Sequence, residues 1–183
     1  MTQNWLTRAL LPVGWGMVLS VTVLCGPAGA GQSGSPGAAA TPVARIRALD
    51  ERAAATLQKG LERSTRFERL VGALEASDLV VYIQTAPLRT RGLLTFMAAT
   101  PAGRLVRISL DSKSMEPCII GLLGHELQHA LEVAGAPDVR DQKSLEQLYA
   151  RIGERSSSGG WCTRPAQLAG AAVLDELRGH CAR

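Results

Sequence analysis

The stretch CIIGLLGHELQHALEV, residues 118–133, decides how the rest of the sequence is interpreted. It has the apolar composition of a buried helix, yet it carries His125, Glu126 and His129 in the order H-E-x-x-H. Two histidines four residues apart lie one turn apart on the same face of a helix. Each can then give a ring nitrogen to one Zn²⁺. The pattern therefore predicts a helix over 116–133 that carries a zinc site.

Glu126 directly follows the first histidine, where it can reach a water on the metal without being a ligand itself. A carboxylate in that position can act as general base while the metal polarises the substrate carbonyl. The competing interpretation is a surface helix with two accidental histidines. It is less favourable, because an apolar helix would then bury three polar groups without partners.

The segments before the motif change from a helical to a strand pattern. Apolar residues recur at helical spacing over 43–63, and Thr65 with Glu68 forms a capping-box pattern that opens a second helix. Ser77 and Asp78 end that helix. Strands are predicted where β-branched and aromatic residues cluster: 79–83, 92–100 and 104–110.

Helical patterns return after the strands, over 116–133, 144–152 and 165–180, and a Ser- and Gly-rich segment at 153–160 predicts a mobile loop. The order of helices, then strands, then helices indicates an α+β fold. We expect a small antiparallel or mixed three-stranded sheet packed with helices. The domain is predicted to span 43–183, with helices over 43–76, strands over 79–110 and helices over 116–183.

The first thirty residues have the order of a secretory signal peptide: Arg8, an apolar run over 9–25, and Ala28-Gly29-Ala30 as a cleavage site. A lipoprotein attached at Cys25 and an uncleaved membrane anchor remain alternatives. Residues 31–42 are predicted to be a flexible linker. The mature protein is therefore expected in the periplasm or outside the cell, without stable membrane association.

The composition excludes several classes of function. The chain has 183 residues, 20 Lys and Arg against 16 Asp and Glu, and 4% aromatic residues. Scattered basic residues with few aromatics argue against a nucleic-acid partner. Phosphate-binding and serine-hydrolase motifs are missing from the sequence. A peptide or protein substrate is the expected partner, and the oligomeric state stays open.

Residues 79–183 resemble the zincin superfamily of metallopeptidases, and the size is similar to that of its compact members, the minigluzincins. The stretches 124–133 and 144–153 are also similar to a group of exported bacterial HExxH proteins. The resemblance implies a small twisted sheet before the motif helix. It also implies an extended substrate antiparallel to an edge strand, here within the hairpin at 92–110, and a third zinc ligand from a later helix or loop.

For that group, an aromatic residue, an acidic residue and a threonine are expected near the start of the last helix. This chain has Trp161-Cys162-Thr163 there, so Cys162 is the predicted third ligand, and a thiolate is a competent one. A disulfide of Cys118 with Cys162 or Cys181 is the alternative. The other candidate ligands are Glu154, Asp138, Asp141, Glu132 and Glu146. Turn or cap roles are favoured for Asp138 and Asp141, and the role of a solvated helix residue for Glu132.

The resulting prediction is an exported zinc-dependent metallopeptidase-like protein that hydrolyses peptide bonds through a zinc-bound water. Because a sulfur ligand lowers the Lewis acidity of the metal, the alternative is a zincin-fold binding or structural module that binds zinc without efficient turnover. Tyr149 and His180 could donate to an oxyanion. Helix packing with a surface hydroxyl is favoured for Tyr149, and a C-terminal cap for His180.

Overall fold

The computed structural model describes residues 44–156 and 160–181. The predicted signal peptide and linker lie outside the described residues. Within the described ranges, no helix combines the length and apolar character needed to cross a membrane. The elements in chain order are β1 (Ile46–Ala48), α1 (Glu51–Arg63), α2 (Thr65–Glu75), β2 (Leu79–Ala86), β3 (Gly92–Thr100), β4 (Gly103–Asp111), α3 (Cys118–Ala134), α4 (Gln142–Ile152), β5 (Glu154–Arg155), β6 (Trp161–Cys162) and α5 (Arg164–Cys181).

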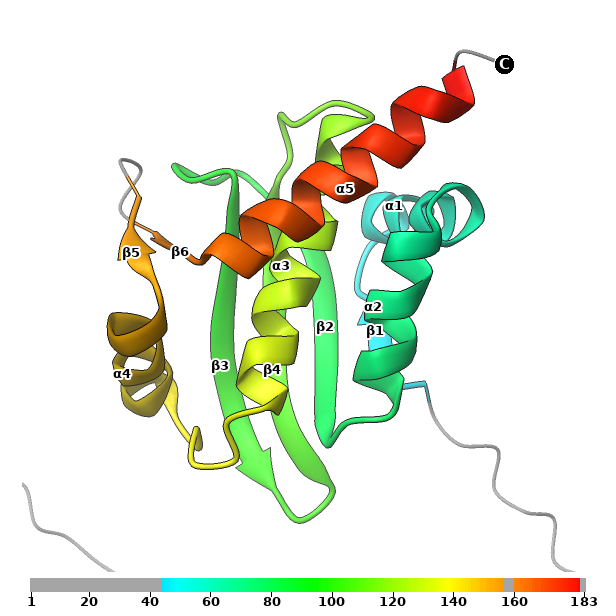
Figure 1. Ribbon diagram of the computed structural model, residues 1–183. Coiled ribbons are helices and arrows are strands. Elements are labelled where there is room, and N and C mark those ends of the chain that lie inside the picture. The colour runs from blue at the N-terminus through cyan, green and yellow to red at the C-terminus, as the bar shows by residue number, and fades with distance from the viewer. Residues whose placement is uncertain (1–43, 157–159, 182–183) are drawn as a thin grey trace, which may run out of the picture. The chain divides into compact units, whose positions relative to one another are not determined.

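The predicted α+β class is confirmed, with one more strand in the sheet than expected. The main sheet has the order β1-β2-β4-β3. β1, β2 and β4 run parallel to one another, whereas β3 pairs antiparallel with β4. The sheet is therefore mixed, and β3 lies at its edge on the side of α4 (Figure 1).

The additional strand corrects the prediction of one helix over 43–63. Residues Ile46–Ala48 pair with β2, and α1 begins only at Glu51. Asp50 ends the extended segment because its side chain accepts a hydrogen bond from the Ala53 N–H and caps the helix. A strand of three residues is too short to show a period of its own.

The second helix begins where the sequence predicted, but with a different cap. The hydroxyl of Ser64, not that of Thr65, accepts the hydrogen bond from the Phe67 N–H. The predicted loop at 153–160 is also corrected in part. Glu154–Arg155 pairs antiparallel with Trp161–Cys162 in a two-stranded ribbon.

The helix α3 packs against the sheet, and α5 crosses over α3 on the side away from the sheet (Figure 1). Glycines allow this close approach. A Cβ at Gly170 of α5 would lie 3.0 Å from the carbonyl oxygen of Gly121 and 3.1 Å from Cβ of His125. The crossing point of the two helices therefore coincides with the first histidine of the motif.

Arg104, at the start of β4, connects the sheet to the end of α3 through hydrogen bonds. Its side chain is 1% exposed and forms two hydrogen bonds to the Asp78 carboxylate, at 2.7 and 2.8 Å. The same guanidinium also donates to carbonyl groups in and after the last turn of α3: those of Val133, Ala134, Ala136 and Val139. Cations are favoured at this end of a helix, where the last carbonyls lack partners.

Candidate functional site

The two motif histidines face each other on α3. Their Nε2 atoms are 3.1 Å apart, and the ring centroids are 4.8 Å apart with the planes nearly perpendicular. Two nitrogens that bind one tetrahedral Zn²⁺ at about 2.0–2.1 Å would be about 3.3 Å apart. The spacing of the two side chains thus fits a shared metal ion.

Each ring is also held by a group outside the facing pair. Nδ1 of His129 lies 2.8 Å from a carboxylate oxygen of Glu132, and the hydroxyl of Thr163 donates to the other oxygen at 2.5 Å. His125 hydrogen-bonds to the backbone carbonyl of Ala166 at the start of α5. Carboxylates and carbonyls in this position orient metal-binding histidines and fix their tautomer.

Burial keeps His125 in its neutral form. Desolvation, followed by the charge of His129, lowers the pKa of His125 to about 4. A neutral imidazole has a lone pair available for a metal, whereas a protonated one has none. At neutral pH, His125 is therefore a competent ligand without first losing a proton.

Glu126 lies beneath the edge strand β3. It is 5% exposed, and burial raises the pKa of its carboxyl group to about 7. A Cβ at Gly92 would overlap the Glu126 carboxylate, so only glycine lets β3 pass this close. A carboxylate with a pKa near the working pH is well suited to general base catalysis.

Tyr149 packs on its helix as expected, but its hydroxyl is buried and not at the surface. It is 4% exposed, its ring packs edge to face against His129 at 5.1 Å, and its hydroxyl donates to the His129 carbonyl at 3.0 Å. Burial, together with the nearby carboxylates, raises the pKa of the phenol. Tyr149 therefore supports His129 from α4. The side chain of His180, the other residue considered as a donor, is not among those described.

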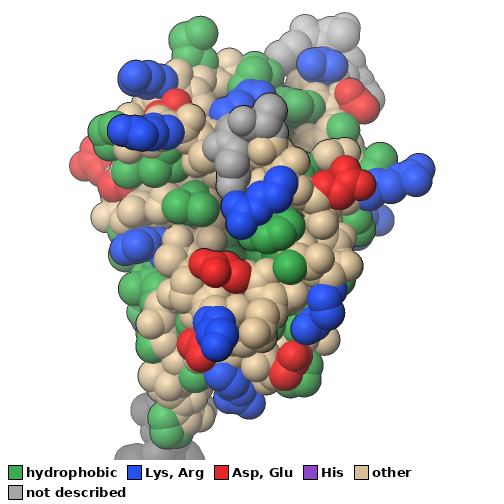
Figure 2. Space-filling view, turned by 90° about the vertical axis from the view of Figure 1, so that its left-hand side faces the viewer, with side chains coloured by type: hydrophobic (Ala, Val, Ile, Leu, Met, Phe, Trp, Pro, Cys, Tyr) green, Lys and Arg blue, Asp and Glu red, His purple; other side chains and the backbone are tan. Residues whose placement is uncertain are grey.

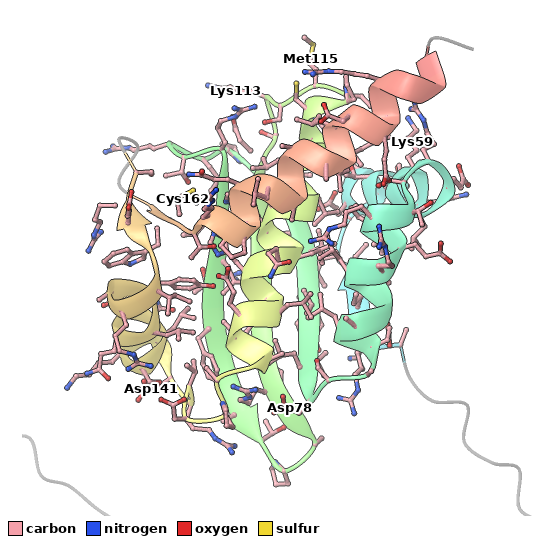
Figure 3. The ribbon with its side chains drawn as sticks, viewed as in Figure 1. Lys59, Asp78, Lys113, Met115, Asp141 and Cys162 are labelled. Atoms are coloured by element: carbon pink, nitrogen blue, oxygen red, sulfur yellow. The ribbon has the colours of Figure 1, made fainter. Side chains whose placement is uncertain are left out.

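Cys162 lies on β6, beside the first turn of α5 (Figure 3). Cys118 and Cys162 are both free thiols, so the alternative disulfide between them is not formed. The Sγ atom of Cys162 accepts a hydrogen bond from Gln167 at 3.1 Å. Cys162 and His125 line the same cavity of about 430 Å³.

A complete set of three ligands is not assembled in this arrangement. Among residues 44–156 and 160–181, as far as their side chains are described, no three His, Cys, Asp or Glu residues form a group that could hold a metal ion. The donor chemistry of His125 and His129 fits zinc, and the role of Cys162 as third ligand stays a prediction.

Three of the carboxylates predicted as alternative ligands make other contacts or are exposed. Asp141 caps α4, where its side chain accepts from the Ser144 N–H, and it lies at the end of α4 away from Cys162 (Figure 3). Asp138 is exposed and lies 3.9 Å from Arg151. Glu154 is exposed on β5, where it pairs with Cys162.

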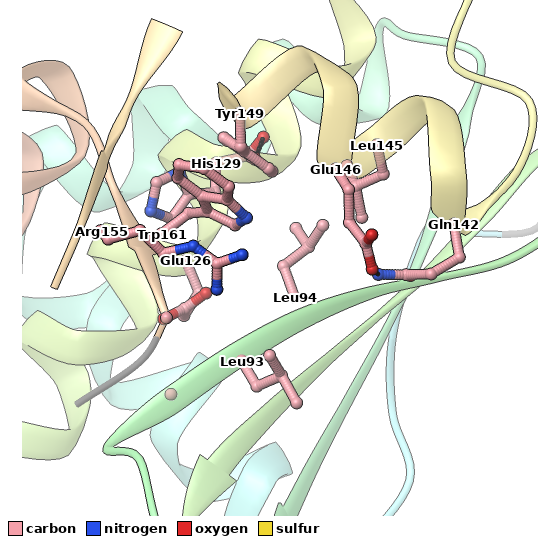
Figure 4. A pocket seen from close by; sticks show the side chains of 12 residues that line it. Leu93, Leu94, Glu126, His129, Gln142, Leu145, Glu146, Tyr149, Arg155 and Trp161 are labelled. Atoms are coloured by element: carbon pink, nitrogen blue, oxygen red, sulfur yellow. Dashed lines mark hydrogen bonds between the residues drawn. The ribbon is translucent and has the colours of Figure 1, made fainter. Parts of the chain in front are cut away.

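A cavity of about 250 Å³ extends from the motif along β3. Figure 4 shows Glu126 and His129 at one end, with Arg155 and Trp161, and Gln142 and Glu146 at the other. The second cavity continues past Gly92 in the opposite direction. On the face that carries α4 and the ribbon, Lys and Arg side chains are interspersed with Asp and Glu (Figure 2). The two cavities together place an open strand edge beside Glu126.

The role of Glu132 differs from the one predicted from the sequence. This residue was expected to be a solvated helix residue, but its side chain is 10% exposed and connects His129 to Thr163. The sequence feature that could have indicated this role is the spacing of Glu132 from His129. Residues three apart in a helix are neighbours, so an acid three residues after the second histidine can reach that ring.

Comparisons with known proteins add no assignment to this geometry: no family model, no curated protein and no solved structure matches the chain.

Proposed function

We propose that this protein is a zinc-dependent metallopeptidase that hydrolyses peptide bonds, with His125 and His129 as zinc ligands and Glu126 as general base. Cys162 is the proposed third ligand. The observation that carries the proposal is the pair of Nε2 atoms 3.1 Å apart, next to a buried carboxylate at an open strand edge. Zinc bound there would polarise the substrate carbonyl and increase the acidity of water.

The chain's own residues have separate tasks in this proposal. Glu132 and the Ala166 carbonyl orient the two imidazoles, so the ligands are preorganised. Glu126 accepts the proton of the attacking water and then has a proton to give to the leaving amine. Because β3 is an edge strand, its backbone groups at Gly92 and Leu94 are available to pair with an extended peptide.

Metal content is the direct test of the zinc site. Purified protein loaded with zinc and then desalted should hold about one zinc per chain. His129→Ala should lose it, because two remaining ligands are too few for a stable site. Elemental analysis measures the content, and an exposed substitution, Glu68→Gln, is the control. Equal zinc in the wild type and His129→Ala would contradict the proposed site.

Hydrolysis of a peptide library by the same samples separates two functions. Cleavage that a chelator stops and added zinc restores supports the peptidase. Stoichiometric zinc without cleavage would instead favour the binding or structural module. Cys162→Ala extends the test, because loss of zinc from this variant supports Cys162 as a ligand, whereas unchanged zinc assigns the third position to another group.

Glu132→Gln should weaken zinc binding by about 10- to 100-fold, because the substitution removes the negative charge behind His129 while it keeps the shape of the side chain. Competition with a fluorescent zinc chelator measures the affinity. Glu68→Gln, on the exposed side of α2, is again the matched control. An affinity equal to that of the wild type would show that Glu132 does not support the metal ligand.

A further inference from the structure

The edge strand β3 offers backbone groups to a ligand over a short distance only. The Arg91 carbonyl accepts from the Asp111 N–H of β4, so Arg91 faces into the sheet. Backbone groups of a strand alternate in direction. The backbone N–H and C=O groups of Gly92, Leu94 and Phe96 therefore point to the open side of β3, next to the cavity that Glu126 lines.

Gln142 of α4 closes this edge at Phe96. The Phe96 N–H donates to Oε1 of Gln142 at 3.1 Å, and Nε2 of Gln142 donates to Glu146 at 3.3 Å. A peptide strand that pairs with Gly92 and Leu94 thus meets the side chains of α4 at Phe96. The edge is open at the Glu126 end and closed at the Glu146 end.

The charge at the closed end selects which terminus of a peptide fits there. Glu146 would attract an α-amino group and repel an α-carboxylate. At the other end, the guanidinium carbon of Arg155 lies 4.3 Å from the centroid of the Trp161 ring, near Glu126 (Figure 4). A peptide with its amino terminus at Glu146 runs antiparallel to β3, with a later peptide bond beside Glu126.

We infer that Glu146 binds the free amino terminus of the substrate, so that the enzyme removes a short N-terminal segment rather than cutting inside long chains. This inference rests on the proposed peptidase function. From Gly92 to Phe96 the strand rises about 13 Å, at about 3.3 Å per residue. Because Gln142 and Glu146 occupy the Phe96 end of this distance, it leaves room for two or three substrate residues before the cleaved bond.

The test compares peptides that have a free amino terminus with the same peptides after N-acetylation. The wild type should prefer the free form by about tenfold in kcat/KM, because hydrogen bonds to charged groups contribute that much. Glu146→Gln should lose this preference and cleave the acetylated peptide as the wild type does. Asp138→Asn, which removes an exposed charge outside the cavity, is the matched control. Mass spectrometry of the products should show release of two or three residues.

A binding measurement keeps the inference testable if turnover is absent. Fluorescence anisotropy with the same peptides, labelled at the carboxyl end, measures affinity for the zinc-loaded protein without requiring cleavage. Tighter binding of the free form that Glu146→Gln abolishes supports the amine site even if peptidase activity fails. Equal affinity for free and acetylated peptides, or cleavage at internal bonds with both, would overturn the inference.

Discussion

Replacing Arg104 with methionine is expected to lower the free energy of unfolding by about 3–5 kcal/mol, because buried carbonyl groups at the end of α3 lose their donor, at about 1–3 kcal/mol for each unsatisfied group. The guanidinium is 1% exposed and serves both the Asp78 carboxylate and the carbonyls at the end of α3. Methionine fills much of the volume but leaves those acceptors without a donor. Urea unfolding followed by circular dichroism measures the change.

The matched control for this substitution is Lys59→Met. Lys59 is paired with Glu116 at 2.5 Å, but its side chain is 48% exposed. Exposed ion pairs contribute about 0–1 kcal/mol, so this variant should unfold near the wild-type urea concentration. If the two variants were equally stable, the buried guanidinium would not be holding β4 to α3.

The Arg104 pair also makes stability depend on pH. Its hydrogen bond to Asp78 lowers the pKa of that carboxyl below its ordinary value of 3.8. A carboxyl group with a lowered pKa in the folded state stabilises the fold above its unfolded pKa, and this contribution is lost as the pH falls through the folded value. The difference in stability between the wild type and Arg104→Met should therefore narrow below about pH 4.

The local part of the site could be predicted from the sequence because it depends on helix geometry alone. His125 and His129 are four residues apart, so any regular helix brings their rings together, as the 3.1 Å separation shows. The strands β3 and β4 could be predicted in the same way, because their composition favours strands and the turn residues at 101–103 favour a hairpin between them. These features require no knowledge of distant contacts.

The remaining features depend on partners far away in the chain. Glu132 appeared to be a solvated helix residue because its buried partner, Thr163, comes 31 residues later. The position of Tyr149 against His129 likewise follows from how α4 docks, which no local pattern records. β1 exists because Ile46–Ala48 pairs with β2, more than thirty residues later. Tertiary contacts, not propensity, decide these positions.

Glu126→Gln is expected to reduce peptide hydrolysis by about 10²- to 10⁴-fold, the range that general base catalysis contributes. Glutamine has almost the shape of glutamate, so it should fit the same buried position beneath Gly92. It has no basic carboxylate to accept a proton from water. Kinetic assays on one peptide substrate measure the loss, and elemental analysis measures the zinc.

Zinc content separates this effect from damage to the metal site. Because Glu126 is not a proposed ligand, Glu126→Gln should keep the same zinc as the wild type, while His129→Ala loses both zinc and activity. Gly92→Ala provides a second test, since its Cβ would displace the Glu126 carboxylate without changing its chemistry. Activity should fall in this variant as well, with zinc retained. Full activity in Glu126→Gln would mean that another group accepts the proton, and Glu126 would then be a buried structural residue.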